Sequence, residues 1–325
     1  MKAVLQSIKH YIKKIMFHVM PTYRMSTHTY RRVDWAWVNL REELRMLDRK
    51  YESMYWFLVN NGDFTSIEKK KQFFKGYECS NKELRERQLS NAQLLKKFRD
   101  LCTANGLMYW LEGGTLLGAI RHDGFIPWDD DIDVNMPLED MLRLKTILKE
   151  EQSEFEFRDK YNCYLGCVVP GITTSKYPNC WIDIFPMSFI DCSILGFDET
   201  KMFINMCSKE MRTILKKKIT IGSNQPDEFV NMEDKDDPRV QFIDKTFLEY
   251  NNKLPIGPNP NCCYRTLSAH NSPGGCDLFY TENVFPLTTA TFEGETYTVP
   301  KNYHEWLTVY YGDYFHVPLS RVPKH

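Results

Sequence analysis

The part of the sequence best suited to chemistry is a short acidic run, Asp129-Asp130-Asp131-Ile132-Asp133, set among apolar residues. Side chains two residues apart along a strand share a face and lie about 6.6 Å apart, so a strand here would gather Asp129, Asp131 and Asp133. Carboxylates on one surface repel one another unless a cation neutralises them. Mg²⁺ typically takes one or two carboxylates together with substrate phosphates. The run therefore predicts a divalent-cation site, for Mg²⁺ or Mn²⁺, with Asp131 and Asp133 as its main ligands.

A glycine turn precedes this acidic run. Gly113-Gly114-Thr115 follows a short apolar segment and opens a predicted helix. Backbone N–H groups at such a turn can bind a phosphate, and glycine lets the ligand approach closely. Two glycines alone are a weak signal, but their position would bring the phosphate beside the cation. We therefore assign substrate binding to the following residues: Gly113, Gly114, Thr115, Arg121, His122 and Asp129. For His122 a structural role is an equally good interpretation.

A third acid, Asp183, lies in another apolar stretch, Trp181-Ile182-Asp183-Ile184-Phe185. A lone carboxylate in a buried strand is costly without a partner. We predict that Asp183 joins Asp131 and Asp133 as a catalytic residue. It would serve as a third metal ligand or as the base that deprotonates an attacking hydroxyl. A structural ion pair is the alternative.

The elements that must position these residues follow from hydrophobic periodicity. Helices are expected over 30–60, 88–104, 116–121, 138–148, 197–219, 239–252 and 302–311. Strands are expected at 107–111, 131–134, 155–158, 164–169, 181–185, 263–268, 289–293 and 296–299, with a connection and short helix at 62–88 and a loop at 222–238. The pattern predicts two parts: a helical N-terminal extension over 1–87 and a catalytic domain over 88–325.

Composition argues against several functions. The chain has 325 residues, 42% hydrophobic and 26% charged, with a net charge of −1. This balance argues against nucleic-acid binding, and the aromatic content of 14% argues against disorder. No apolar run is long enough to predict a membrane span. Ten cysteines without a signal peptide indicate a cytoplasmic, reducing setting with the cysteines as thiols rather than zinc ligands.

The first twenty residues form a basic amphipathic pattern, with apolar residues at helical spacing and lysines between them. Such a helix can lie on a membrane surface, or it can pack against protein, and the sequence favours neither. The long amphipathic helix expected over 30–60 offers a surface for a homo-oligomer.

The runs from Gly113 to His122 and from Gly124 to Asp133 resemble the LicD family of bacterial phosphocholine transferases, which is similar to the eukaryotic fukutin-type ribitol-phosphate transferases. The resemblance covers about residues 88–318. It extends to Asp183-Ile184-Phe185-Pro186, Phe292-Glu293-Gly294 and Tyr310-Tyr311-Gly312-Asp313-Tyr314. One departure is Asn135, where the family often has glycine. The cysteine-rich zinc loop of the fukutin-related branch has no clear counterpart, which favours the bacterial branch.

The resemblance implies a nucleotidyltransferase-like α/β (α+β) core with a mixed sheet, and with the glycine turn and the aspartate pair at one edge. It implies Mg²⁺ and a CDP-linked alcohol as donor. A phospho-alcohol, first of all phosphocholine, would pass to a hydroxyl of a surface glycan or its lipid-linked precursor, and CMP would leave. By position, Asp131 and Asp133 would bind the metal, Asp183 would be the third acid, and Gly113 to Thr115 would meet the donor phosphates. Such an enzyme would work in the cytoplasm, at the inner membrane face if residues 1–20 bind lipid.

Three other functions fit parts of the sequence. A nucleotidyltransferase would use the same residues on an NTP and release pyrophosphate. A glycosyltransferase would use Asp131-Ile132-Asp133 as its DxD motif, although residues 1–88 lack the nucleotide-binding unit expected upstream. A membrane-surface scaffold would need none of the three aspartates, so their presence counts against it. A choline group would need an aromatic cage, for which Trp110, Trp128 and Trp181 are candidates.

Overall fold

The computed structural model describes residues 67–76, 78–150, 153–220, 229–254, 257–269 and 278–315. The chain divides into two compact units, one of residues 71–314 and the other of Met1–Lys70 with Phe315–His325. The helices predicted within 1–20 and 30–60 lie outside the described residues. Among the helices that the structure describes, none is both long and apolar enough to cross a membrane.

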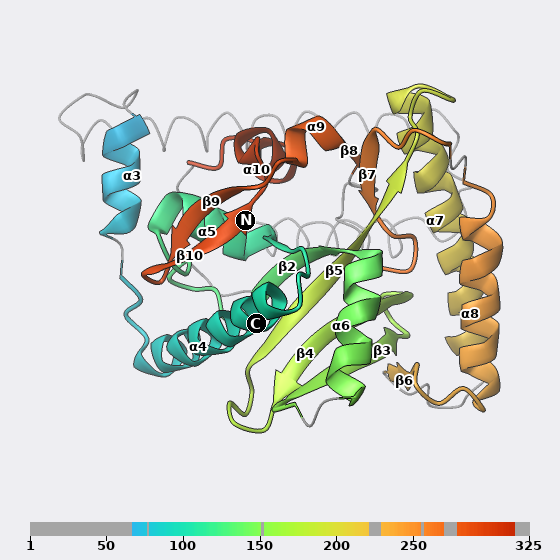
Figure 1. Ribbon diagram of the computed structural model, residues 1–325, viewed down its shortest axis with the longest axis horizontal. Coiled ribbons are helices and arrows are strands. Elements are labelled where there is room, and N and C mark those ends of the chain that lie inside the picture. The colour runs from blue at the N-terminus through green and yellow to red at the C-terminus, as the bar shows by residue number, and fades with distance from the viewer. Residues whose placement is uncertain are drawn as a thin grey trace, which may run out of the picture. The chain divides into compact units, whose positions relative to one another are not determined.

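The larger unit is built on a mixed sheet, which confirms the predicted mixed α/β fold (Figure 1). Its main path runs β1-β2-β5-β4-β3-β6, and β7 and β8 continue from the far half of β5. The strands β2 and β5 run parallel, and the other pairs are antiparallel. The bounds are β1 Trp110–Leu111, β2 Ile132–Pro137, β3 Phe155–Asn162, β4 Cys167–Thr174, β5 Trp181–Ile190, β6 Phe229–Asn231, β7 Cys262–Arg265 and β8 Leu278–Tyr280. A separate hairpin pairs β9 (Thr288–Phe292) with β10 (Glu295–Val299).

Most predicted helices of this unit are confirmed, with small changes at their ends. They are α3 (Ile67–Lys75), α4 (Lys82–Ala104), α5 (Gly113–His122), α6 (Leu138–Glu150), α7 (Phe197–Thr220), α8 (Pro238–Asn251) and α10 (Tyr303–Tyr311), and the sequence did not predict the short α9 (Thr281–Val284). The helix α4 starts earlier than predicted because Asn81 caps it, its side chain accepting from the N–H of Leu84. The boundary placed between 87 and 88 therefore falls inside α4.

Two predicted strands differ in a way that matters for the site. Of the strand predicted at 107–111, only Trp110 and Leu111 pair with β2. The strand predicted at 131–134 begins at Ile132, so Asp129 and Asp131 precede it. The backbone carbonyls of the acidic run are taken by side chains of α4 instead of a neighbouring strand: Gln88 donates to Asp129 and Asn91 donates to Asp130. The prediction of three aspartates on one strand face is therefore wrong.

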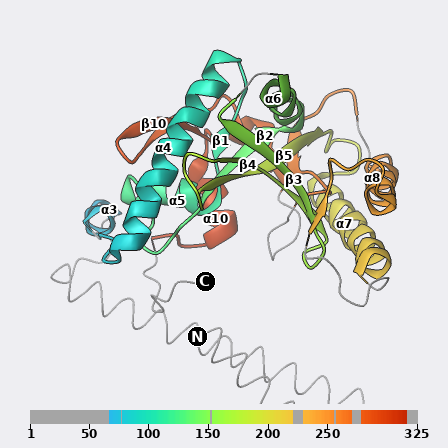
Figure 2. The same cartoon turned by 90° about the horizontal axis from the view of Figure 1, so that it is seen from below.

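The loop predicted at 222–238 is also partly wrong, because it contains β6. Val230 pairs with Tyr161 of β3 and is only 1% exposed. Burying this apolar residue extends the sheet edge inside an otherwise polar stretch. Val230 also belongs to a second apolar cluster, formed mainly by α7, α8 and the strands beside them. The helices α7 and α8 lie side by side there (Figures 1 and 2).

The two faces of the central sheet have opposite character. One face carries a row of apolar side chains in register, Phe157, Ile172, Ile182 and Ile132. The helix α6 packs on this face, where Lys145 lies over the Phe157 ring. Side chains alternate along a strand, so the residues between these point to the other face, toward α4. There Arg87 of α4 lies 4.8 Å from the ring centre of Trp181.

The edge of the sheet is joined to the C-terminal helix by a buried ion pair between Glu112 and Arg265. Arg265 Nη2 lies 2.8 Å from Glu112 Oε1, and the two side chains are only 6% and 1% exposed. The other carboxylate oxygen accepts from Asn135 of β2 and from the Trp306 indole of α10. Arg265 also donates to the hydroxyl of Tyr310. One residue thus holds together β1, β2, β7 and α10.

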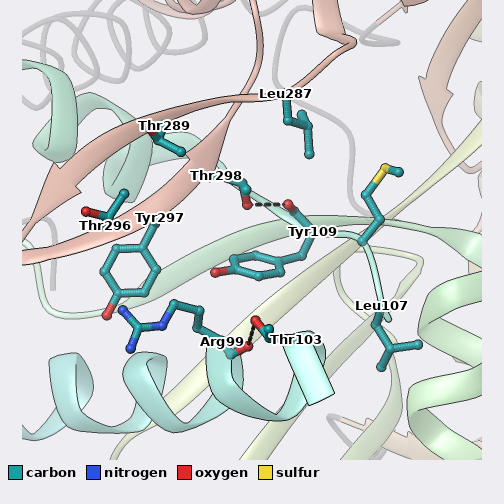
Figure 3. A pocket seen from close by; sticks show the side chains of 10 residues that line it. Arg99, Thr103, Leu107, Tyr109, Leu287, Thr289, Thr296, Tyr297 and Thr298 are labelled. Carbon is teal, nitrogen blue, oxygen red and sulfur yellow. Dashed lines mark hydrogen bonds between the residues drawn. The ribbon is translucent and has the colours of Figure 1, made fainter. Parts of the chain in front are cut away.

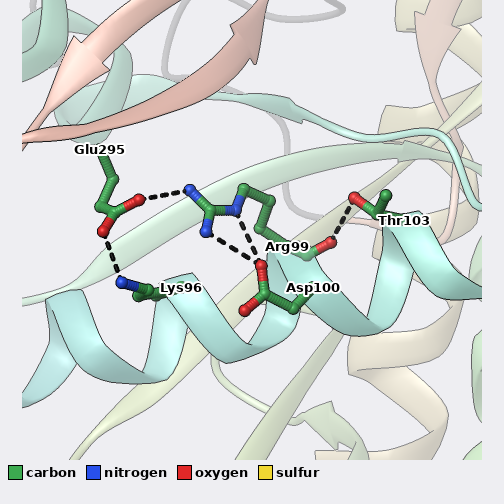
Figure 4. A network of polar contacts seen from close by, with 5 residues as sticks. All are labelled: Lys96, Arg99, Asp100, Thr103 and Glu295. Atoms are coloured by element: carbon green, nitrogen blue, oxygen red, sulfur yellow. Dashed lines mark hydrogen bonds and ion pairs between the residues drawn. The ribbon is translucent and has the colours of Figure 1, made fainter.

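The β9–β10 hairpin is fixed to α4 by charged contacts at the surface (Figure 4). Glu295 accepts from Lys96 at 2.5 Å and from Arg99 at 2.8 Å. At the hairpin turn, Glu293 binds Arg85 through both carboxylate oxygens, at 2.8 and 2.7 Å. Exposed pairs contribute little stability singly, so we interpret this series as setting the position of the hairpin along α4.

Replacing Arg265 by leucine should destabilise the fold by about 3–5 kcal/mol, because Glu112 would keep its charge without its buried partner. Adding Glu112→Gln should recover part of that loss, since the uncompensated charge is then removed. Urea unfolding followed by circular dichroism measures both. The control is Arg239→Leu, which breaks an exposed pair with Asp237 and should cost less than about 1 kcal/mol. Equal losses for Arg265→Leu and Arg239→Leu would contradict the assigned role.

Candidate active site

The centre of the site is a pair of aspartates on neighbouring parallel strands. Asp133 of β2 is in register with Asp183 of β5, so both side chains point to the face turned toward α4. Neighbouring strands lie about 4.8 Å apart, which brings the two carboxylates together as the sequence analysis predicted. Burial raises the pKa of Asp133 well above its ordinary value, and the charges of Asp131, Asp183 and Asp129 raise it further. A cation at this position would relieve the repulsion.

Asp183 has a cationic partner already. Burial raises its pKa to about 6, against the opposing effects of the Arg158 charge and of hydrogen bonds from Trp181 and Arg158; Asp131 adds to the rise. Arg158 donates from Nη2 to Asp183 Oδ1 across the intervening strand β4. The sequence analysis did not identify Arg158. Its alternation with apolar residues in β3 was visible, but the partner depends on the strand order.

Asp129 and Asp131 lie in the segment that leads into β2. Gln88, which is fully buried, donates to the carbonyls of Ile126 and Asp129 at 3.2 and 2.8 Å. Asp130 forms an ion pair with Arg87 at 2.6 Å. These contacts from α4 fix the segment without using the side chains of Asp129 and Asp131. The negative charges of both raise the pKa of Asp133, which places them in its neighbourhood.

The glycine turn lies directly against these acids. Gly113 has a φ of +53°, and a Cβ there would lie 2.6 Å from Asp133 Oδ2. A Cβ on Gly114 would meet the carboxylate of Asp129. Glycine is therefore needed at both positions for the acids to approach the backbone. The next residue, Thr115, is buried, and its hydroxyl accepts from the N–H of Asp133 at 2.9 Å, so it holds the start of β2 in place.

Arg121 and His122, assigned to substrate binding from the sequence, lie inside the fold. Arg121 is 4% exposed and donates to the carbonyl of Tyr314 at 2.7 Å, and the Phe74 ring centre lies 4.5 Å away. Burial, with the adjacent Arg121 charge, lowers the pKa of His122 to about 3. The imidazole is therefore neutral at physiological pH. Both residues join α5 to its surroundings in this structure, and a direct contact with substrate stays a prediction.

The loop that precedes the acidic run is held by Glu293 of the hairpin turn. Besides binding Arg85, Glu293 accepts from the N–H of Phe125 at 3.1 Å, and its own N–H donates to the carbonyl of Asp123. Burial would raise the pKa of Glu293, but hydrogen bonds from Arg85 and Phe125 and the Arg85 charge outweigh it and lower the pKa. A charged Glu293 thus positions the Gly124 loop. Its motif was noted in the sequence, but its role was not.

The donor set suits a hard divalent cation. In the described part of the chain, no three His, Cys, Asp or Glu side chains form a ready-made metal-binding group. Two carboxylates suffice, however, where substrate phosphates complete the coordination. Asp133 and Asp183 present carboxylate oxygens from adjacent strands, and burial together with the surrounding carboxylates raises the pKa of Asp133, an effect that a cation would oppose. The residues fit Mg²⁺ or Mn²⁺ on this ground.

The remaining candidates are a pocket, the tryptophans and the cysteines. A pocket of about 230 Å³ is lined by α4, the segment before β1 and the β9–β10 hairpin, including Tyr109, Thr298 and Arg99, and none of the site acids lines it (Figure 3). Of the three tryptophans, Trp110 is fully buried against Trp306, whereas Trp128 and Trp181 are half-buried. The nine described cysteines are free thiols, and all but Cys79 are buried.

The comparisons with known proteins place this fold and site in a transferase family with a nucleotidyltransferase domain. The family described as "LicD/FKTN/FKRP, nucleotidyltransferase domain" matches residues 106–209. The chain is 30% identical to the lipopolysaccharide cholinephosphotransferase LicD of Haemophilus influenzae over 256 residues, which are 74% of this chain and 94% of that protein. A shorter segment of 38 residues is 60% identical to the human ribitol 5-phosphate transferase FKRP, 12% of this chain and 8% of that protein. The chain belongs to the LicD family.

Replacing Gly113 by alanine should lower the rate of group transfer by about a hundredfold, the effect of misplacing a reacting group by about 1 Å. The added Cβ would displace the Asp133 carboxylate. Gly106→Ala is a matched control, because its φ is +61° and nothing lies within 4 Å of the added Cβ. Both variants should lose similar stability from left-handed strain, about 1–2 kcal/mol, but only the first should lose activity. Equal activity losses would show that strain alone is responsible.

The stability of the protein should fall between pH 6.5 and pH 3, partly through His122. The unfolded chain takes up a proton there near pH 6.5, whereas the folded protein does so only near pH 3. Stability is therefore lost as pH falls, by about 1.4 kcal/mol per pH unit from this residue. His122→Gln removes the contribution, and the difference between the two proteins in urea unfolding at several pH values measures it. Parallel pH profiles would contradict the assignment of a neutral, buried His122.

Proposed function

We propose that this chain transfers a phospho-alcohol, most simply phosphocholine, from a CDP-linked donor to a hydroxyl of a surface glycan or its lipid-linked precursor, with release of CMP. The observation that carries the proposal is the in-register pair Asp133 and Asp183 beside the Gly113–Gly114 turn. Similarity over nearly the whole length of a cholinephosphotransferase supports this choice of reaction. The shorter match to a ribitol 5-phosphate transferase makes ribitol the first alternative alcohol.

The residues of the site would have three roles: binding the cation, binding the donor phosphates and positioning Asp133. A divalent cation bound by Asp133, with Asp131 and Asp183, would offset the charge of the donor phosphates and of the leaving CMP. Gly113 and Gly114 let the carboxylates of Asp133 and Asp129 lie against the turn, whose backbone N–H groups would meet the donor phosphates. Thr115 fixes the backbone of Asp133. Phosphoryl transfer needs mainly alignment and charge stabilisation from a protein, and these contacts provide both.

A donor panel tests the reaction directly. The full chain with Mg²⁺ is given CDP-choline, CDP-ethanolamine, CDP-ribitol, CDP-glycerol, UDP-sugars or NTPs, with crude bacterial surface glycan as acceptor, and the released nucleotide is measured. We expect CMP from one CDP-alcohol, loss of the reaction in EDTA, and recovery when Mg²⁺ is restored. Asp131→Asn with Asp133→Asn should reduce the rate by about a hundredfold or more.

Asp244→Asn is the matched control, because Asp244 is an exposed carboxylate of α8 paired with Lys235, and it should leave the rate unchanged. Release of pyrophosphate from an NTP would assign a nucleotidyltransferase. UDP from a sugar donor would assign a glycosyltransferase. CMP release that the double substitution leaves intact would rule out the assigned acids.

A further inference from the structure

Four residues from four strands form one row across the acidic face of the sheet. Asp133 of β2 is in register with Asp183 of β5, Asp183 with Gly171 of β4, and Gly171 with Arg158 of β3. Residues directly opposite one another on paired strands share a face. The row therefore places a guanidinium at one end and the catalytic carboxylates at the other. Arg158 and Asp183 are separated by two strand spacings, about 9.6 Å.

Gly171 allows Arg158 to reach across. A Cβ at position 171 would lie 3.0 Å from Arg158 Nη2 and 3.4 Å from Asp183 Oδ1. The guanidinium thus lies over bare backbone on its way to Asp183. Trp181, two residues before Asp183 on the same face, has its ring centre 6.0 Å from the Arg158 guanidinium. The contact between Arg158 and Asp183 therefore depends on the glycine at position 171 of the strand between them.

Like the Arg87–Asp130 pair, whose side chains are 28% and 18% exposed, the Arg158–Asp183 pair is partly accessible. Its two side chains are 24% and 19% exposed, whereas Arg265 is sealed against Glu112 and Arg121 is 4% exposed. A guanidinium has five N–H donors, and the hydrogen bond to Asp183 uses one of them. Arg158 can therefore take a second anionic partner from solvent.

We propose that Arg158 binds a phosphate of the donor and exchanges its hydrogen bond with Asp183 for this contact. The inference rests on the proposed function for the identity of the donor, but not for the anion site itself. An acidic face needs a cation to accept an anionic substrate, and guanidinium groups bind phosphate oxygens in a forked geometry. Arg158 also keeps Asp183 paired while no substrate is bound.

The test measures binding of inorganic pyrophosphate by titration calorimetry in EDTA, so that no metal or nucleotide is involved. Asp183→Asn removes the carboxylate charge that pairs with Arg158 and so frees the guanidinium. It should bind pyrophosphate about tenfold or more tightly than the wild type, as expected for one charge-assisted hydrogen bond. Adding Arg158→Gln should abolish the gain, and adding Arg158→Lys should keep part of it. Adding Arg239→Gln instead removes one positive charge from α8, far along the sequence, and should keep the whole gain in pyrophosphate affinity.

A gain that survives Arg158→Gln would overturn the proposal, because it would come from the lost negative charge alone. If the Asp183→Asn protein fails to fold, Arg158→Gln and Arg239→Gln are compared in the wild-type background. Only the first should then weaken pyrophosphate binding, by about tenfold, and equal effects of the two would overturn the proposal. Dependence on Arg158 without transfer from any CDP-alcohol would leave the anion site standing and the proposed donor wrong. CMP release from a CDP-alcohol with no dependence of pyrophosphate binding on Arg158 would support the proposed function and overturn the anion site.

Discussion

The geometry of the site depends on the buried pair of Glu112 and Arg265. Taking two charges out of water costs several kcal/mol per ion unless hydrogen bonds satisfy both. Here Asn135 and Trp306 donate hydrogen bonds to the Glu112 carboxylate, and the Arg265 guanidinium lies 4.2 Å from the Phe185 ring centre. Glu112 is also hydrogen-bonded through its backbone, since its N–H donates to the carbonyl of Asp133 and its carbonyl accepts from the N–H of Leu116. Glu112 therefore fixes the chain immediately before the glycine turn from both sides.

The residue Asn135, noted in the sequence as a departure from the family pattern, belongs to this buried network. The Asn135 side chain is fully buried and donates to Glu112. It lies two residues after Asp133 on the same strand face, so the strand that carries Asp133 also carries a hydrogen-bond donor to the Glu112–Arg265 pair. The departure noted in the sequence thus adds a contact to the buried network and leaves the acids in place.

The elements of the larger unit could be predicted because their signals are local. Periodicity gave α6, α7 and α8 nearly to their ends, and the asparagine and glycine after Ala104 ended α4 where expected. The acidic run could not be placed correctly, because Gln88 and Asn91 take its backbone carbonyls from a helix far earlier in the chain. The residue types at the site could be predicted from the sequence, but their interaction partners could not. Types are written in the motif, whereas the partners Arg158, Arg265 and Glu293 depend on strand order and on the hairpin.

The distribution of charge sets Asp133 apart from the neighbouring acids. Asp130 has Arg87 and Asp183 has Arg158, and in each case the cation comes from a neighbouring element. Asp133 is different, since burial and the surrounding carboxylates all raise its pKa. Its ionised form destabilises the fold, and a positive charge at this point would remove that penalty. A protein that needed only stability would place an apolar residue there instead of a carboxylate. A strongly raised pKa on one carboxylate, Asp133, beside a glycine that it requires, Gly113, is characteristic of a site that binds a charged ligand.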